Sequence, residues 1–266
     1  MAESSVEAEM WRTVAMLELR RGPTLQALAG YRMQVRRQVQ ASMCKVSAVK
    51  RRGLRGIEEE MANIELQNGE ELKCAVHAVF RKAVAEPAHG ETCAKIALAL
   101  RHRYPQFPPE PESEKPLSFT RVLLTVTQAE FESLPCTLEA SADDVAKFPD
   151  SEALQAEVER RRHVMLSCVS FIGHLFLEHL LPLKVLKQVV QDLVGLTQGR
   201  PSPPEGHRID CVVELLMLVG PSLERRPSSG ALLIEIESRL RDLTFLGLCS
   251  GELCFAIRNL AWHHFG

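Results

Sequence analysis

A nearly continuous apolar stretch from Val164 to Glu178 constrains the fold of this chain more than any other segment. Its apolar residues recur at helical spacing on more than one side, so a helix here must be covered by protein on several faces. The stretch does not qualify as a membrane span, because His174 interrupts it and Pro182 follows it, well short of the roughly 20 apolar residues that a bilayer requires. The sequence therefore predicts the central helix of a helical stack.

The rest of the chain also favours helices. Aromatic residues make up only 5% of the sequence, and no segment shows the clear alternation of a strand. From Cys44 onward, about ten segments of helical periodicity, separated by Pro, Gly or Ser, predict an all-α fold: an α-solenoid of about five HEAT-type antiparallel helix pairs. The helices expected there with defined bounds are Leu54–Leu66, Asn68–Ala85, His89–Arg103, Phe119–Ser133, Pro182–Leu196, Ile209–Leu223, Ala231–Leu246 and Ser250–Phe265.

Two parts of the chain are distinguished by composition. Residues 1–42 are expected to be a helical, basic N-terminal extension, and residues 43–266 the HEAT-repeat domain. In the extension, Gly22-Pro23 separates two predicted helices, Val6–Arg20 and Thr24–Gln40, and a short helix, Cys44–Lys50, is expected after it. The acidic segment from Pro135 to Asp150 is expected to be irregular.

Charge is distributed unevenly. The first 56 residues contain eleven Lys or Arg and four Asp or Glu, a local charge of about +7, whereas the whole chain has a net charge of −2. This region is either a solvated basic face or a surface for nucleic acid or an acidic partner. The candidate RNA-binding residues in it are Arg32, Arg36, Arg37, Lys50, Arg51, Arg52 and Arg55.

Four segments resemble, in the same order, the middle domain of eukaryotic translation initiation factor 4G. They are Val-Phe-Arg-Lys-Ala-Val-Ala-Glu-Pro at residues 79–87, Phe119 to Ser133, Phe-Ile-Gly-His-Leu-Phe at 171–176 after the arginines at 160–162, and Asp210 to Gly220. The resemblance covers roughly residues 44–265. It departs from the family pattern at Cys93, where a tyrosine is usual, and at His163-Val164, which occupy the family's two arginine positions in an ungapped match.

The resemblance implies a non-enzymatic scaffold in translation initiation that binds a DEAD-box RNA helicase of the initiation factor 4A class and associates weakly with mRNA. The positions that match the family's helicase contact are Arg161, Arg162, Phe171, Gly173, Leu175 and Phe176, and Arg258 keeps part of an RNA-binding pattern in the last helix. We expect Leu175 and Phe176 to lie where the buried helix reaches solvent, although both could be core residues. The alternative is a stand-alone HEAT adaptor in mRNA export, decay or specialised translation that binds other proteins.

No catalytic or cofactor motif is evident. The sequence lacks a phosphate loop, a nucleophile elbow and a zinc-protease motif, and His174 and His179 are five residues apart, so they do not share a helix face. Asp143-Asp144 is expected to be solvated. We therefore expect no enzyme activity, cofactor, metal, small-molecule substrate or membrane partner. The eight cysteines form no Cys-x-x-Cys pair and the first residues are charged, which suggests the cytoplasm, or alternatively the nucleus.

Overall fold

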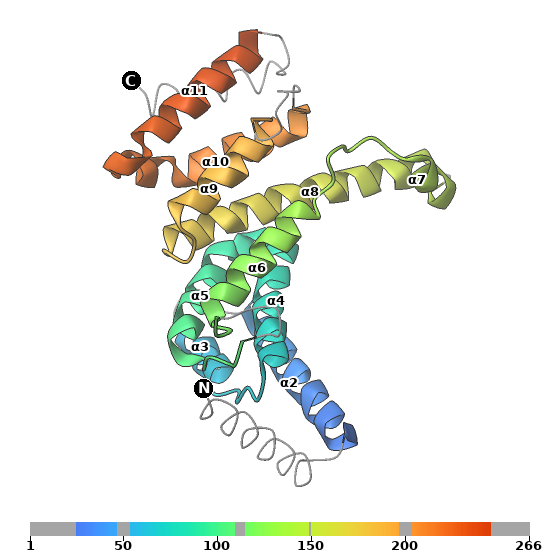
Figure 1. Ribbon diagram of the computed structural model, residues 1–266. Helices are drawn as coiled ribbons and strands as arrows, with labels where there is room; N and C mark the ends of the chain where they lie inside the picture. The colour runs from blue at the N-terminus through green and yellow to red at the C-terminus, as the bar shows by residue number, and fades with distance from the viewer. Residues whose placement is uncertain (1–24, 47–53, 110–114, 149, 197–203, 246–266) are drawn as a thin grey trace, which may run out of the picture.

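The structure is a computed structural model that describes residues 25–46, 54–109, 115–148, 150–196 and 204–245, with only the backbone described for 25–32 and 54–55. Within these ranges the chain forms ten α-helices, two short 3-10 helices and a single β-bridge, between Phe107 and Leu117. Figure 1 shows the helices stacked from α2 to α11, with the long helix α8 crossing the middle. The predicted all-α solenoid is confirmed.

The helices of the N-terminal half form antiparallel neighbours around one core (Figure 1). They are α2 (Leu25–Lys45), α3 (Leu54–Ala62), α4 (Gly69–Ala85), η3 (Pro87–His89), α5 (Gly90–Arg103) and α6 (Phe119–Glu132). The C-terminal half comprises α7 (Ala142–Lys147), α8 (Ser151–Leu177), α9 (Leu183–Leu193), α10 (Gly206–Glu224), η4 (Pro227–Ser229) and α11 (Gly230–Phe245). None of these helices combines the length and apolar character needed to cross a membrane.

Helix α4 begins where its sequence predicts. The side chain of Asn68 accepts a hydrogen bond from the backbone amide of Glu71 at 3.0 Å, which satisfies one of the free amides of the first turn. The Glu71 carboxylate accepts from the Gln67 amide at 2.7 Å, and it lies near the positive end of the helix dipole. These reciprocal bonds fix the N-terminus of α4, whose buried face packs against α2, α6 and α8.

Helix α8 has the central position that its apolar sequence predicts. It packs against α4, α5, α6, α9 and α10, and its residues from Met165 to Phe176 are mostly buried. However, α8 begins thirteen residues before the apolar stretch, at Ser151, and none of residues 151–164 is buried. Together with α7, this N-terminal part projects from the body as an arm (Figure 1).

Two expectations about local structure are wrong. The break expected between Gln40 and Cys44 does not exist, because α2 is continuous from Leu25 to Lys45. Val35, Val39 and Met43, each at most 1% exposed, form one stripe at helical spacing that belongs to the main core. The position 42/43, proposed as a domain boundary, therefore lies inside a helix.

The segment from Pro135 to Asp150 contains α7 rather than being irregular throughout. Its helix has a capping box: Ser141 accepts from the Asp144 amide at 3.2 Å, and Asp144 accepts from the Ser141 amide at 2.9 Å. This reciprocal pair makes a six-residue helix possible in an acidic segment with little apolar periodicity.

Candidate protein-interaction site

The four apolar positions predicted to contact a helicase lie together on α8, and we call them the α8 hub: Phe171, Gly173, Leu175 and Phe176. All four are buried, and the exposed fractions of Leu175 and Phe176 are both 0%. The expectation that Leu175 and Phe176 lie at the solvent boundary is therefore wrong. The apolar side chains of the hub cannot touch a partner in this structure, and their contacts are with neighbouring helices.

Phe171 joins α8 to α4. Its ring packs edge-on against Phe80, with the ring centroids 5.1 Å apart and an interplanar angle of 82°. This edge-to-face arrangement is a favoured geometry for aromatic pairs. Phe80 belongs to the first of the four segments on which the resemblance rests and Phe171 to the third, so two segments that are far apart in the sequence meet through these rings.

Gly173 allows α10 to approach α8 closely. A Cβ atom at this position would lie 2.7 Å from Cδ2 of Leu218 and 3.0 Å from Cδ1 of Leu215, both on α10. On the other side, a Cβ at Gly90, the first residue of α5, would lie 2.9 Å from the His174 ring. The hub region is thus in close contact with both the preceding and the following helices of the stack.

The turn between α8 and α9 brings together three residues that we call the turn cluster: Arg101, His179 and Arg226. His179 has a φ of 57°, a left-handed conformation that is uncommon for a residue other than Gly. Arg226 donates a hydrogen bond to Nδ1 of His179 at 2.9 Å, and its guanidinium lies 4.7 Å from the ring centroid of Phe176. Arg101 approaches the His179 carbonyl oxygen at 3.4 Å.

The turn cluster is where the buried hub reaches the surface, although sequence reasoning did not identify its two arginines. The cation–π contact orders the Arg226 side chain over the hub. The only sequence signal for Arg226 is its place before Pro227, which is too general to indicate a site.

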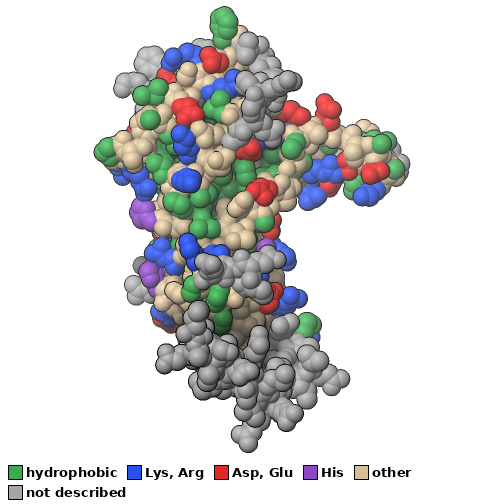
Figure 2. Space-filling view, in the orientation of Figure 1, with side chains coloured by type: hydrophobic (Ala, Val, Ile, Leu, Met, Phe, Trp, Pro, Cys, Tyr) green, Lys and Arg blue, Asp and Glu red, His purple; other side chains and the backbone are tan. Residues whose placement is uncertain are grey.

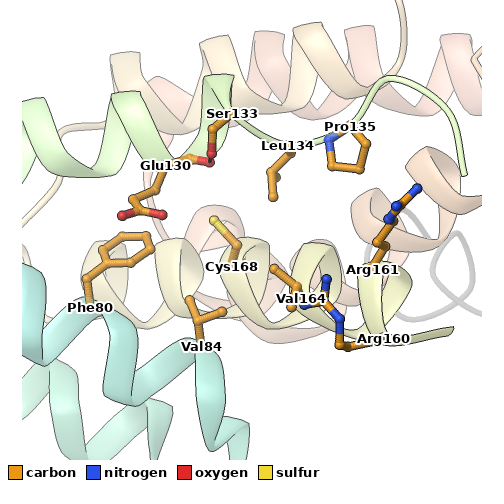
Figure 3. Close-up of a pocket in the computed structure, with 10 residues that line it drawn as sticks. All are labelled: Phe80, Val84, Glu130, Ser133, Leu134, Pro135, Arg160, Arg161, Val164 and Cys168. Atoms are coloured by element: carbon orange, nitrogen blue, oxygen red, sulfur yellow. Dashed lines mark hydrogen bonds between the residues drawn. The ribbon is translucent and has the colours of Figure 1, made fainter. Parts of the chain in front are cut away.

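At the other end of α8, the two predicted arginines, Arg161 (Figure 3) and Arg162, have different surroundings. Arg161 donates to Asp144 through both terminal nitrogens, one of them 2.8 Å from Oδ2, and to Glu157 at 3.0 Å. Arg162 donates to Asp210 of α10 at 2.6 Å, and 44% of its side chain is exposed. The Arg161 side chain is less exposed, at 25%.

Asp144 is not the solvated carboxylate expected from the sequence. Its exposed fraction is 6%, and the hydrogen bonds from Arg161 hold its pKa well below the usual range. Hydrogen bonds from Arg160 and then Arg161 lower the pKa of Glu157 to about 2. These carboxylates stay ionised near neutral pH, so the ion pair between Arg161 and Asp144 holds α7 against the N-terminal part of α8.

A small pocket lies beside these arginines, with a volume of about 270 Å³. Figure 3 shows it between α4, the C-terminal end of α6 and α8, with Phe80, Glu130, Leu134, Arg161 and Cys168 among the lining residues. Burial raises the pKa of the Cys168 thiol to about 12, so this cysteine is protonated and unreactive near neutral pH. The pocket has the character of a surface depression rather than of a catalytic site.

The candidate RNA-binding residues are only partly described. Arg36 and Arg37 are exposed on α2, and Arg32 and Arg55 lie in α2 and α3 with side chains that are not described. Lys50, Arg51, Arg52 and Arg258 lie outside the described residues. In the described part of the chain, no group of three or more His, Cys, Asp or Glu side chains is arranged to hold a metal ion.

Comparison with known proteins gives consistent results. The family model described as the MIF4G domain matches residues 36–246. Eukaryotic translation initiation factor 4G of Arabidopsis thaliana is 25% identical over 204 residues, which are 75% of this chain and 11% of that protein. Human eukaryotic translation initiation factor 4 gamma 2 is 24% identical over 199 residues, 72% of this chain and 20% of that protein.

A likeness in fold is also found among solved structures. The MIF4G domain of a Trypanosoma cruzi translation initiation factor aligns with a TM-score of 0.51 and 17% sequence identity, covering 86% of this chain and 94% of that domain. At this identity the likeness concerns the fold alone. The chain spans between about a tenth and a fifth of the length of these two curated relatives.

Proposed function

The chain belongs to the MIF4G family, whose model matches residues 36–246, and we propose that it is a non-enzymatic scaffold of the translation initiation type. The observation that carries the proposal is this match across nearly the whole described stack, together with the relatives named initiation factor 4G. We further propose that it binds a DEAD-box RNA helicase of the initiation factor 4A class and associates with mRNA in the cytoplasm.

The proposed helicase surface follows α8. The buried hub cannot contact a partner directly, so its role in the proposal is to hold the exposed groups at each end of the helix in place. Those groups are Arg162, paired with Asp210, and the turn cluster, whose Arg226 rests on the Phe176 ring. A rigid helix that presents two separate surfaces can touch two lobes of a partner, and it shifts the partner's conformations only if it prefers one arrangement.

Replacing Arg162 by Ala tests this surface. We expect the affinity for a purified helicase of the 4A class, measured by isothermal titration calorimetry, to fall on the order of tenfold, because arginine is enriched among residues that dominate binding energy. The melting temperature should change little, since an ion pair as exposed as Arg162–Asp210 contributes about 0–1 kcal/mol to stability.

The matched control is Arg241→Ala, which removes an exposed, ion-paired arginine on α11. If the unaltered chain binds the helicase and Arg162→Ala binds it equally well, the contact assignment is wrong while the helicase proposal stands. If the unaltered chain does not bind the helicase at all, the helicase proposal is wrong, and an adaptor for other proteins in mRNA metabolism becomes the better account.

The proposed mRNA contact lies in the basic N-terminal region. Removing residues 1–56 would not test it cleanly, because Val35, Val39 and Met43 of α2 belong to the core. The double variant Arg36→Gln with Arg37→Gln leaves the core intact, since both side chains are exposed. Each lost phosphate contact should reduce the slope of log affinity against log salt by about 0.7 for single-stranded RNA, so the slope should fall by about 1.4.

Binding of a fluorescent single-stranded RNA at several salt concentrations measures this slope. The double variant Arg160→Gln with Arg241→Gln removes two arginines that are also exposed but lie outside the proposed region, and it should leave the slope unchanged. Equal slopes for the unaltered chain and the Arg36/Arg37 variant would exclude these two residues from the RNA contact.

A further inference from the structure

An open groove lies between α6 and α9, and neither the helicase surface nor the proposed RNA contact uses it. Its volume is about 670 Å³, and Met165 of α8 contributes to its lining. The apolar lining comes mainly from the two flanking helices and the segment after α6: Leu124, Phe131, Leu134, Val185, Val189 and Leu193. Figure 2 shows hydrophobic side chains gathered in the middle of this face, between the positions of α6 and α9 in Figure 1.

The rim of the groove is polar and carries charges of opposite sign on its two sides. On α6, Gln128 donates to the carboxylate of Glu132 at 2.7 Å, and both side chains are exposed. On α9, Lys184 and Gln188 are exposed. Lys184 forms no ion pair with any described residue, whereas the neighbouring Lys187 pairs with Glu235 of α11 at 3.3 Å.

Three other polar residues line the groove: Asp192, Arg208 and Thr127. The guanidinium of Arg208, from α10, donates to the Asp192 carboxylate at 2.9 Å, so these two rim charges are already neutralised. The hydroxyl of Thr127, on the wall formed by α6, is 1% exposed and has no hydrogen-bond partner among the described residues. The uncompensated rim charges are therefore Lys184 on one side and Glu132 on the other.

We propose that this groove binds an amphipathic helix of a partner protein. The apolar groove between α6 and α9 can accommodate a third helix that packs against both. A helix docked in this way buries its residues at positions i, i+3 or i+4, and i+7. The volume of about 670 Å³ has room for several large apolar side chains of such a helix. The opposite charges of the rim set the orientation: an acidic residue of the bound helix lies beside Lys184 and a basic residue beside Glu132.

The chemistry of the groove distinguishes this occupant from the others. A nucleic acid needs a basic surface, whereas the uncompensated charges here are one cation and one carboxylate. Exposed polar side chains on both rims, Glu132 and Lys184, leave the groove accessible to a polypeptide that lies across the surface. This inference does not depend on the helicase proposal, because the groove shares no residue with the proposed helicase surface.

Selection from a displayed library of helical peptides, with the purified full chain as target, tests the inference. The enriched peptides should share apolar residues at i, i+3 or i+4, and i+7, with an acidic residue on one flank. Val185→Lys places a charge on the apolar lining and should weaken binding of the enriched peptides at least tenfold. The matched control is Ile234→Lys, because Ile234 is 68% exposed on α11 and does not line the groove.

A second variant tests the inference without altering the apolar lining of the groove. Lys184 is exposed, so Lys184→Glu should leave folding intact while reversing the selection from an acidic to a basic flanking residue. If no such peptides are enriched, or if they bind both Lys184→Glu and Val185→Lys as tightly as the unaltered chain, the proposal is wrong. A concentration-dependent dimer in light scattering that Val185→Lys abolishes would overturn it too, because the occupant would then be a second copy of the chain.

Discussion

Replacing Phe176 by Ala is expected to lower the free energy of unfolding by about 3–5 kcal/mol, as is typical of a fully buried phenylalanine. Its exposed fraction is 0%, and its ring supports the guanidinium of Arg226 at 4.7 Å. The substitution therefore leaves a cavity in the hub and also removes the surface on which Arg226 rests. Urea unfolding followed by circular dichroism measures the loss.

The same variant separates a core role from a direct contact. Well below its melting temperature, Phe176→Ala should weaken helicase binding only as far as Arg226 loses its support, because the missing side chain itself does not reach the surface. Ile234→Ala is the control, since 68% of Ile234 is exposed and its loss should change stability by only a few tenths of a kcal/mol. Unchanged stability combined with strongly weakened helicase binding would show that Phe176 is a contact residue after all.

Replacing Gly173 by Leu is expected to destabilise the protein by about 1–3 kcal/mol or more, because the added side chain enters a packed interface. Its Cβ alone would lie 2.7 Å from Leu218 and 3.0 Å from Leu215. Leu218 is half-buried and can move, but Leu215 is 0% exposed and has no space to enter. Thermal unfolding should show a lower melting temperature for the variant.

Two companion variants define the cause of this effect. Gly173→Ala should cost much less than the Leu variant, since replacing a helical Gly by Ala gains up to about 1 kcal/mol of helix propensity. Gly56→Leu on α3 should not destabilise the protein, because no atom lies within 4 Å of the Cβ position there. If Gly173→Leu is as stable as the unaltered chain, α8 and α10 must be less tightly packed than described.

Sequence patterns predicted the helices well where apolar periodicity and capping agree. Asn68 marks the start of α4 as predicted, and the apolar run before His179 lies at the centre of the stack. Patterns were less informative about the ends and surroundings of helices. The capping box of Ser141 and Asp144 was overlooked, because an acidic segment with few apolar residues does not show helical periodicity.

The candidate site was harder to predict, because burial depends on which helices come together. The motif at residues 171–176 lies on the central helix of the stack, but apolar periodicity on every side of a helix does not indicate which part reaches solvent. Phe176 is covered by Arg226, which lies 50 residues later in the chain. The turn cluster and the groove are likewise formed by residues from separate helices, so no local pattern indicated them.

The projecting arm gives α8 the properties of a lever. Residues 151–159 extend about 13 Å beyond the part of the helix that contacts α4, α6 and α10, at 1.5 Å per residue. With this length, a rotation of the packed part by about 10° would displace the tip by roughly 2.3 Å. The pKa of Glu157 is about 2, and the pKa of Asp144 also lies well below its usual range. Both carboxylates therefore stay ionised at mildly acidic pH, and Arg161 keeps α7 attached to the N-terminal part of α8. Small readjustments among α4, α5 and α10 are therefore magnified at α7.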